Sequence, residues 1–390
     1  MWYFRSPQIV FGAGALDHLA YLKGTRALIV TDALMVRLGF VDKVKAKLAE
    51  AGLECDVFDQ VEPEPSLQTV RHGAAFMLEK QPDWIVGLGG GSALDAAKAM
   101  WILYERPDLA PEQINPFDDL GLRRKARMAA IPTTSGTGSE ATWAVVLTDT
   151  HEQCKISTGA PECTPDIAIV DPVFAAQMPP RLTADTGLDA LTHAVEGYTS
   201  AWHNDFADGP CLKAIQIIFD YLPRACADGE DMEAREKMHN AAALAGLGFI
   251  NSLAAAAHAL GHSLGAVFHI PHGRAVSLFL PYTIQFTTRG DRPARYADIA
   301  RFLGLPAADE REGADSLVSA IRDLERQVGQ PLSIRQALPD LAPEALAACL
   351  DKLVDNAERD PTIVACVRDI STADTRHLFE YAYEGKDIDF

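Results

Sequence analysis

The sequence lacks any long uninterrupted apolar run. No segment has about 18 or more consecutive uncharged apolar residues, the length that a transmembrane helix needs. The longest candidate, residues 241–260, contains Asn251, Ser252 and His258, which favours a buried helix instead. The first residues show no basic segment followed by an apolar one, so we expect no signal peptide. We therefore expect a soluble protein with no membrane partner.

Cysteine is sparse, and its spacing is not that of a disulfide scaffold. The chain has seven cysteines among 390 residues, and no two of them form a CxxC pair. An odd and scattered set argues against a disulfide framework. Free cysteines are typical of reducing compartments, so we expect a cytoplasmic location.

Basic residues are few relative to acidic ones. The chain has 35 lysines and arginines against 54 aspartates and glutamates, a formal net charge of -19. An anionic surface repels nucleic acid and acidic membranes, so we expect a small-molecule partner and no nucleic acid. Apolar residues (48%) and charged residues (23%) are at globular levels, and the length suggests two domains.

The first 180 residues alternate short apolar runs with amphipathic stretches. Strands are expected at 27–31, 54–58, 84–88, 129–131 and 167–171. Helices are expected between them, at 41–51, 66–80 and 93–104. Strands that alternate with helices predict an α/β domain with a parallel sheet that is covered on both faces.

The pattern changes near Pro179-Pro180. Beyond these prolines strand-like runs nearly vanish, and helical patterns dominate at 184–200, 209–222 and 231–262 and continue to residue 383. The acidic stretch 309–315 is interpreted as a solvated loop. We therefore expect an α/β domain over residues 1–180 and an all-α domain over residues 181–390.

Residue types that bind metals gather in the helical half. Asp189 and His193 are four residues apart, as are His258 and His262, and His272 stands between a proline and a glycine. Residues four apart share one face of a helix. Imidazole and carboxylate are common ligands of divalent transition metals, although a single histidine on an apolar helix is more often a core residue. The pattern predicts a metal site, and the spacing leaves open which histidines bind and which metal they hold.

A glycine-rich turn joins an apolar run to a helical one at Gly89-Gly90-Gly91-Ser92. Glycines allow a pyrophosphate to approach the backbone, and a helix N-terminus supplies N–H donors. The pattern is not GxGxxG, so a tight turn that needs positive φ is the alternative.

Two further features follow strand ends, where ligands bind in open α/β sheets. Thr133, Thr134 and Thr137 offer hydroxyl groups in one loop, for which a plain polar loop is the alternative. Asp32 directly follows the first strand, where a carboxylate can bind ribose hydroxyls and repel a 2′-phosphate. A helix-cap aspartate is the alternative for Asp32.

Several motifs occur together and in order along the chain. They are the glycine turn with Asp95 and Lys98, then the segments 132–140, 187–196, 258–265 and 271–273. With these motifs the chain resembles the iron-containing (group III) alcohol dehydrogenases, which include lactaldehyde and propanediol reductases. The resemblance runs from Ile9 to about Ser371. It implies a dinucleotide-binding first domain and a second domain that binds the metal.

The resemblance also implies roles for the metal-site residues. It implies that Asp189, His193, His258 and His272 hold the metal, usually Fe(II) and in some members Zn(II). It implies that His262 is no ligand but lies near the nicotinamide and the substrate. We expect His262 to relay a proton, with packing as the alternative role.

The resemblance extends to the cofactor and the substrate pocket. It implies that both loops line the dinucleotide, that Asp95 belongs to this site, and that Lys155 lies close by unless it is a solvated surface lysine. The Asp32 position favours NAD over NADP. Trp143 and Phe249 match positions that line the substrate pocket, or are ordinary core aromatics.

Two features bear on substrate range. Arg274 follows the turn at His272 and could hold an acidic substrate, although a structural ion pair is the more usual role for a cation there. Many relatives carry Cys-Thr-x-x-Asn-Pro-Arg near the active cleft, whereas here residues 362–368 begin with Thr362 and lack the Asn-Pro pair. This departure puts any borrowed substrate range in doubt.

Together these features predict an enzyme that transfers hydride between a small primary alcohol, or its aldehyde, and NAD(P). The alternatives are a lyase or synthase of the dehydroquinate synthase type, whose branch lacks the histidine at position 193, a reductase for an acidic aldehyde, or a non-catalytic sensor. We also expect a homodimer, because residues 9–11 are apolar and could pair as an edge strand.

Overall fold

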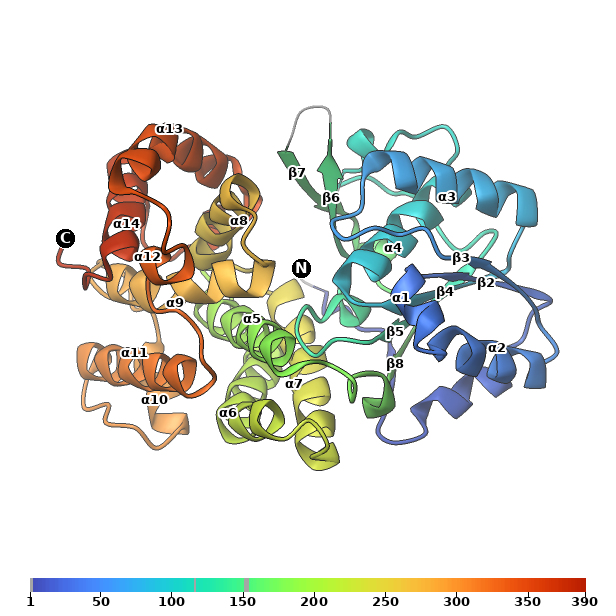
Figure 1. Cartoon of the computed structure of the whole chain (residues 1–390), viewed down its shortest axis with the longest axis horizontal. Coiled ribbons are helices and arrows are strands. Elements are labelled where there is room, and N and C mark those ends of the chain that lie inside the picture. Colours follow the sequence, from blue (N-terminus) through green and yellow to red (C-terminus); the bar gives the residue numbers. More distant parts are fainter. Residues whose placement is uncertain (1–2, 116, 151–153) are drawn as a thin grey trace. The chain divides into compact units, whose positions relative to one another are not determined.

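The computed structural model describes residues 3–115, 117–150 and 154–390. The chain divides into two compact units (Figure 1). One unit spans Arg5–Gln177, and the other spans Met178–Phe390 together with Tyr3 and Phe4. Each unit is described below by itself.

The unit at residues 5–177 is built on a six-stranded parallel sheet. Its strands are β1 (Gln8–Phe11), β2 (Arg26–Val30), β3 (Glu54–Phe58), β4 (Trp84–Gly89), β5 (Arg127–Pro132) and β8 (Ile167–Val170). Their order is β1-β8-β5-β4-β2-β3, and every neighbouring pair is parallel. The predicted α/β fold with a parallel sheet is confirmed. Residues 9–11 lie in β1, which is an edge strand of this sheet.

Alternate residues of the central strands enter two separate hydrophobic cores. Leu28 and Ile85 belong to one core, and Ile29 and Val86 belong to the other. Successive side chains of a strand point to opposite faces, so both faces of the sheet are buried. Burial of both faces explains why these strands read as continuous apolar runs in the sequence.

Helices and one hairpin complete this unit. The helices are α1 (Ala33–Arg37), α2 (Phe40–Glu50), α3 (Leu67–Lys80) and α4 (Gly91–Glu105), with the 3-10 turn η1 (Ala15–Tyr21). An antiparallel pair, β6 (Ala144–Asp149) and β7 (Cys154–Gly159), was not expected from the sequence. Strand β6 begins with the apolar residues 144–147, whereas β7 mixes apolar and polar residues and shows no continuous apolar run.

The second unit is helical, and no strand occurs among its described residues. Its helices are α5 (Pro180–Thr199), α6 (Asp205–Ala227), α7 (Met232–Ile250), α8 (Ala256–Phe268), α9 (His272–Thr287), α10 (Tyr296–Phe302), α11 (Glu310–Gln327), α12 (Ile334–Ala337), α13 (Pro343–Arg359) and α14 (Thr372–Glu384). The predicted all-α second half is confirmed. None of the helices described here is long and apolar enough to cross a membrane.

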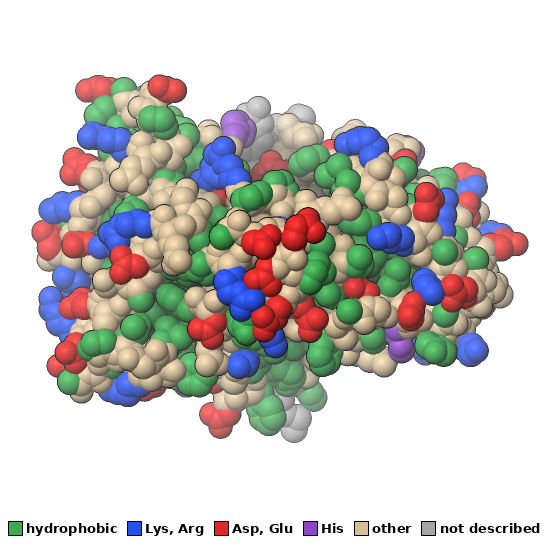
Figure 2. Space-filling view, turned by 60° about the horizontal axis from the view of Figure 1, so that its bottom comes forward, with side chains coloured by type: hydrophobic (Ala, Val, Ile, Leu, Met, Phe, Trp, Pro, Cys, Tyr) green, Lys and Arg blue, Asp and Glu red, His purple; other side chains and the backbone are tan. Residues whose placement is uncertain are grey.

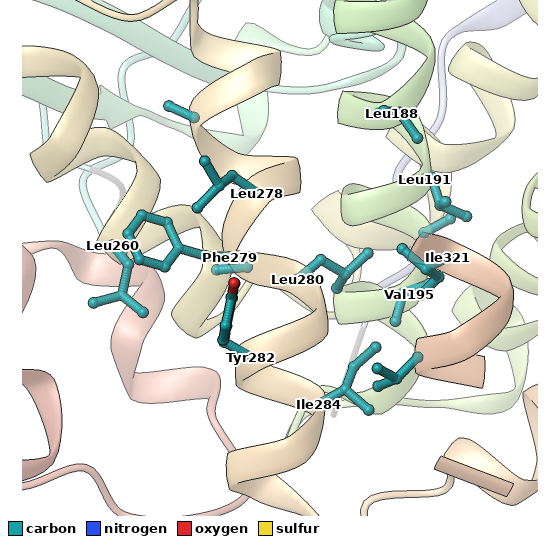
Figure 3. Packing of buried hydrophobic residues seen from close by; sticks show 14 of the residues in the cluster. Leu188, Leu191, Val195, Leu260, Leu278, Phe279, Leu280, Tyr282, Ile284 and Ile321 are labelled. Carbon is teal, nitrogen blue, oxygen red and sulfur yellow. The ribbon is translucent and has the colours of Figure 1, made fainter. Parts of the chain in front are cut away.

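The core of the helical unit forms around α5 and α9 (Figure 3). Leu188, Leu191 and Val195 of α5 pack in one cluster with Leu280 and Ile284 of α9. These residues recur at helical spacing, so each helix turns one apolar face to its neighbours. The packing holds α5 and α9 rigidly beside each other, and both helices carry candidate metal ligands.

Two sequence expectations for this unit are wrong. Residues 231–262 do not form one helical stretch, because α7 ends at Ile250 and α8 starts at Ala256. Leu253 between them has φ of 82°, a left-handed conformation that a helix cannot contain. The acidic stretch 309–315 is not a loop but the N-cap and first turns of α11. Asp309 is the N-cap, and its side chain accepts the N–H of Glu312. Acidic residues at a helix N-terminus are favoured by the helix dipole.

Charged side chains are spread over the surface. On the face that Figure 2 shows, acidic and basic side chains both occur, and a group of acidic side chains gathers near the centre of the view.

Candidate functional site

Four side chains from three helices converge in the helical unit. Asp189 and His193 lie one turn apart on α5, His258 lies in the first turn of α8, and His272 begins α9. One ligand-type atom from each residue lies within 4.8 Å of those of the others. The Oδ1 atom of Asp189 lies 3.3 Å from His272 Nε2, 3.7 Å from His193 Nδ1 and 3.9 Å from His258 Nε2. The structure therefore brings all four predicted ligands to one point.

Three of these converging atoms are buried without a hydrogen-bond partner. They are Asp189 Oδ1, His193 Nδ1 and His258 Nε2, and their residues are 1%, 5% and 2% exposed. Buried polar atoms are almost always paired, because an unpaired one loses its bonds to water. One carboxylate and three imidazoles around one point fit a divalent transition metal, which would satisfy all of these atoms at once.

The electrostatics of the cluster favour the ligand forms of Asp189 and His193. Burial alone raises the pKa of Asp189, but the surrounding histidines outweigh it and hold the pKa of this carboxyl below its usual range. Burial lowers the pKa of His193 well below its usual value. A carboxylate beside a neutral imidazole is the form that binds metal without first releasing protons.

Glu196 is a hydrogen-bond partner of His258 in the cluster, and the sequence did not reveal this role. Its Oε2 lies 2.6 Å from His258 Nδ1, which turns Nε2 of that ring toward Asp189. Its carboxylate also accepts the N–H groups of Ala255 (2.9 Å) and Ala257 (2.5 Å) at the start of α8. Such a partner fixes ring orientation and tautomer of a metal-binding histidine. Glu196 follows Asp189 by seven residues, two helical turns, and this spacing was the available signal.

The predicted pocket aromatics occupy different units. Phe249 of α7 is 9% exposed and stacks on His193, with ring centroids 4.1 Å apart and planes 13° apart. Trp143 lies just before β6, is half-buried and packs against the core of the sheet unit. Phe249 thus holds a ring of the cluster in place, whereas Trp143 contributes to a separate core.

His262 lies beside the cluster and has a carboxylate partner. Its ring stacks on His272, with centroids 5.1 Å apart and planes 24° apart. Its Nδ1 lies 2.7 Å from Asp360 Oδ2. Burial lowers the pKa of His262, and Asp360 offsets part of this effect. Asp360 is a second functional candidate that sequence reasoning missed, because it is 98 residues away along the chain.

The segment that departs from the family pattern supports Asp360. Thr362 donates both its N–H (2.9 Å) and its hydroxyl (2.6 Å) to Asp360 Oδ1. Arg368, at the end of the segment, donates to the backbone oxygens of Phe286 (2.7 Å) and Phe390 (3.2 Å). Thr362 therefore positions the carboxylate, and Arg368 ties the C-terminal residues to α9.

Arg274 is engaged in a structural ion pair. Its Nη2 donates to both carboxylate oxygens of Asp185, at 2.9 and 2.8 Å, and its Nε donates to Asp185 Oδ1 at 3.0 Å. Nε also lies 3.2 Å from Gln330 Oε1. This network joins α5 to α9 one turn from Asp189. The ion-pair interpretation of Arg274 therefore describes its contacts, and the paired Nε and Nη2 atoms are not available to an acidic substrate.

The two predicted cofactor loops lie against each other in the sheet unit. The N–H of Thr133 donates to Gly89 O at 3.0 Å. A Cβ at Gly90 would lie 3.3 Å from Thr134 Cγ2, and one at Gly91 would lie 2.9 Å from Thr137 Cγ2. Side chains at these glycines would push the loops apart.

The glycine turn also leaves a helix N-terminus open. Gly89 has φ of 148°, a conformation that favours glycine, and Gly90 is the N-cap of the 15-residue helix α4 with no side-chain cap. The first N–H groups of α4 thus have no capping side chain and are suited to a phosphate group.

Asp32 both caps a helix and reaches the glycine turn. Its Oδ1 accepts the N–H groups of Leu34 (2.7 Å) and Met35 (3.1 Å) at the start of α1. Its Oδ2 would lie 3.6 Å from a Cβ at Gly89. Asp32 can therefore cap α1 through Oδ1 while Oδ2 remains available for a cofactor.

Three further predicted cofactor residues are held by protein contacts. Ser92 Oγ accepts the N–H of Glu64 at 3.3 Å, and Lys155 forms an ion pair with Glu64 at 2.8 Å. Asp95 accepts the Ser139 hydroxyl at 2.6 Å and the Val146 N–H at 2.9 Å. Both oxygens of Asp95 thus join α4 to the segment after β5.

Buried Lys98 belongs to the same junction. Its Nζ donates to Ser139 Oγ (2.8 Å), Thr142 Oγ1 (3.3 Å) and Ala144 O (3.0 Å). It also lies 3.7 Å from Asp95 Oδ1. These contacts give Asp95 and Lys98 a structural role beneath the two loops.

Comparisons with known proteins agree with this arrangement. The family model for iron-containing alcohol dehydrogenases matches residues 6–172, and the model for the C-terminal part of Fe-containing alcohol dehydrogenases matches residues 183–383. The NADPH-dependent butanol dehydrogenase of Clostridium saccharobutylicum is 40% identical over 393 residues, which cover 100% of both chains. Longer relatives, the aldehyde-alcohol dehydrogenases, are matched over less than half of their length.

Solved structures agree as well. A 1,3-propanediol oxidoreductase is 33% identical, with a TM-score of 0.90 over 98% of this chain and 100% of that one. A sulfoacetaldehyde reductase from Bifidobacterium kashiwanohense, in complex with NAD+, is 28% identical, with a TM-score of 0.86 over 98% of each chain. With both halves matched in order and the cluster in place, this chain belongs to the iron-containing alcohol dehydrogenase family.

Proposed function

We propose that this protein is a metal-dependent alcohol dehydrogenase that transfers hydride between a small primary alcohol, or its aldehyde, and NAD(P). The observation that carries the proposal is the set of buried, unpartnered atoms of Asp189, His193 and His258 around one point. Relatives named for butanol and 1,3-propanediol support a short, uncharged substrate. The histidine at position 193 argues against the lyase alternative.

The metal would be held by Asp189, His193, His258 and His272. We propose Fe(II), with Zn(II) as the second candidate, since imidazole and carboxylate suit both. A bound divalent ion would supply Lewis-acid polarisation of the substrate oxygen. His272 is the one cluster residue whose side chain is substantially exposed, at 42%, so it marks the side from which solvent reaches the cluster.

His262 is proposed to move the alcohol proton. When Asp360 accepts the Nδ1–H of His262, the tautomer leaves Nε2 without a proton, so that Nε2 can accept one. Asp360 then stabilises the imidazolium that forms. In aldehyde reduction the same nitrogen returns the proton. The nicotinamide carries the hydride, and the protein's task is to orient it.

The dinucleotide is proposed to bind the open N-terminus of α4 and the threonine loop. The candidate contacts come from Gly89, Gly90, Gly91, Ser92, Thr133, Thr134 and Thr137, with Asp32 toward the adenosine ribose and Lys155 nearby. Asp32 favours NAD, because its carboxylate would repel a 2′-phosphate. The 40% identical relative is named for NADPH, so the coenzyme preference needs its own measurement.

We also propose a homodimer in the cytoplasm. The six cysteines that the structure describes with their side chains are free thiols, which supports a reducing compartment. Light scattering that gives only a 42.2 kDa species would reject the dimer.

The proposed activity is tested with protein that has been stripped of metal and reloaded anaerobically with Fe(II) or Zn(II). Nicotinamide absorbance is followed with NAD or NADP against primary alcohols, diols and hydroxy acids. Turnover that returns with metal and is fastest on a small uncharged alcohol supports the proposal. Absence of turnover with every pair, despite bound metal and coenzyme, rejects it.

A further inference from the structure

A cavity of about 820 Å³ lies in the helical unit, apart from the metal cluster. Its walls come from the start of α5, the end of α6, the end of α11 and the segment that leads into α12. None of Asp189, His193, His258 and His272 lines it. Its volume is within the range of about 300–1,000 Å³ that is usual for ligand pockets.

Hydrogen-bond donors line the walls of this cavity. Arg181, Arg274, Gln327, Gln330 and Gln336 line it, and no aspartate or glutamate does. This composition is unusual in a chain with a formal net charge of -19. Asp185, which is not part of this lining, pairs with Arg274, whereas Arg181 has no acidic partner among the described residues, so the wall favours a negatively charged ligand.

Arg274 offers one donor that the protein leaves unused. The residue is 8% exposed, and its Nε and Nη2 are bound by Asp185 and Gln330. Among the described residues, Nη1 has no hydrogen-bond partner. The Asp185 pair holds the guanidinium rigidly, so Nη1 is preorganised for a ligand in the cavity.

A second source of positive potential is the start of α5. Pro180 and Arg181 lie in the first turn of this 20-residue helix, and both line the cavity. No side chain caps this helix, and its N-cap is Pro179. The first N–H groups of a helix have no partner within it, and the helix dipole attracts anions. The Arg181 side chain forms no ion pair or hydrogen bond with the described part of the chain.

We propose that this cavity binds a small organic anion through a phosphate or carboxylate group, held by Arg274 Nη1, Arg181 and the N-terminus of α5. The site goes beyond the proposed dehydrogenase activity, because it shares no residue with the metal cluster or the cofactor loops. Arg274 follows His272 by two residues and binds Asp185, one turn before Asp189. An anion here therefore contacts the network that joins the two ligand-bearing helices.

The test is a calorimetric titration of inorganic phosphate and, separately, of succinate into the metal-loaded enzyme. The enzyme is first saturated with its coenzyme, so that the dinucleotide site is filled. The variants are Arg181→Gln and Gln327→Glu, both at exposed positions on the cavity wall, so neither removes a core contact. The control is Arg376→Gln, on α14 and outside the cavity lining.

We expect wild-type enzyme to bind at least one probe, and the tighter probe identifies the anionic group. Both cavity variants should bind that probe at least about tenfold more weakly, because each changes the charge at the ligand. The control should bind as wild type does. If neither probe binds, or if either cavity variant binds as tightly as wild type, the proposal is wrong. This outcome leaves the dehydrogenase proposal untouched, since the titration measures binding and not turnover.

Discussion

His262 Nδ1 lies 2.7 Å from Asp360 Oδ2, although 98 residues separate the two along the chain. The carboxylate is 9% exposed and is itself fixed by two hydrogen bonds from Thr362. A buried pair of this kind determines which nitrogen of the histidine carries the proton. The tautomer of the proposed proton carrier therefore depends on a segment that lies after α13.

Asp360→Asn should lower kcat by about 100-fold, because the amide keeps the shape but does not stabilise a protonated His262. KM for the alcohol and the bound metal should change little, since His262 is not a ligand in this arrangement. Steady-state kinetics and metal analysis of the purified variant measure both. Asp369→Asn, at an exposed position of the same segment, serves as the control. A large loss of metal with unchanged kcat per bound ion would contradict the positioning role.

Glu196→Gln should weaken metal binding by about 10- to 100-fold, because the outer partner of a metal-binding histidine tunes its basicity and orientation. Competition with a chelator gives the metal affinity, and circular dichroism checks the fold. Glu233→Gln, at an exposed position near the start of α7, is the matched control. Unchanged metal affinity in a folded Glu196 variant would show that the charge of Glu196 does not support metal binding.

Asp32→Ser should shift the coenzyme preference toward NADP. Serine retains the N-cap of α1, so the change removes the charge without the ~1 kcal/mol that loss of a cap costs. The ratio of kcat/KM for NAD to that for NADP should fall at least about tenfold, since the repelled 2′-phosphate is now accepted. A ratio equal to that of wild type would mean that Asp32 is a helix cap and nothing more.

Glu325→Gln should stabilise the protein at neutral pH. Both carboxylate oxygens of Glu325 are buried without a partner among the described residues, and burial raises its pKa well above the usual value. The folded state therefore keeps a proton that the unfolded state releases above about pH 4.3, so this group costs stability as the pH rises from there toward the folded pKa. Below about pH 4.3 both states are protonated and the cost vanishes.

The glutamine variant cannot ionise and should escape this cost. Its advantage over wild type should grow by up to about 1.4 kcal/mol per pH unit between pH 5 and the folded pKa. Urea denaturation at a series of pH values, with exposed Glu344→Gln as the control, measures it. A pH-independent difference between variant and wild type would show that Glu325 has a partner when folded.

The strands of the sheet were predictable because both faces are buried. The continuous apolar run 84–88 follows directly from that burial, and it coincides with β4 to within one residue. The β6–β7 pair was not found, because the mixed residues of β7 resemble those of many loops. The break between α7 and α8 was also missed, because alanine and glycine continue through both helices. The carboxylate of Glu196, about 60 residues earlier, accepts the N–H groups of Ala255 and Ala257 at the start of α8.

The sequence by itself determined the fold class and the residue types that bind the metal, because apolar periodicity and a spacing of four residues on a helix are local properties of the chain. It could not determine which histidines meet. Only the packing of α5, α8 and α9 decided that His258 and His272 join Asp189, while His262 turns to Asp360. Glu196 and Asp360 are hydrogen-bond partners of His258 and His262 only because distant segments of the chain come together in space. Local sequence patterns do not show which distant segments meet.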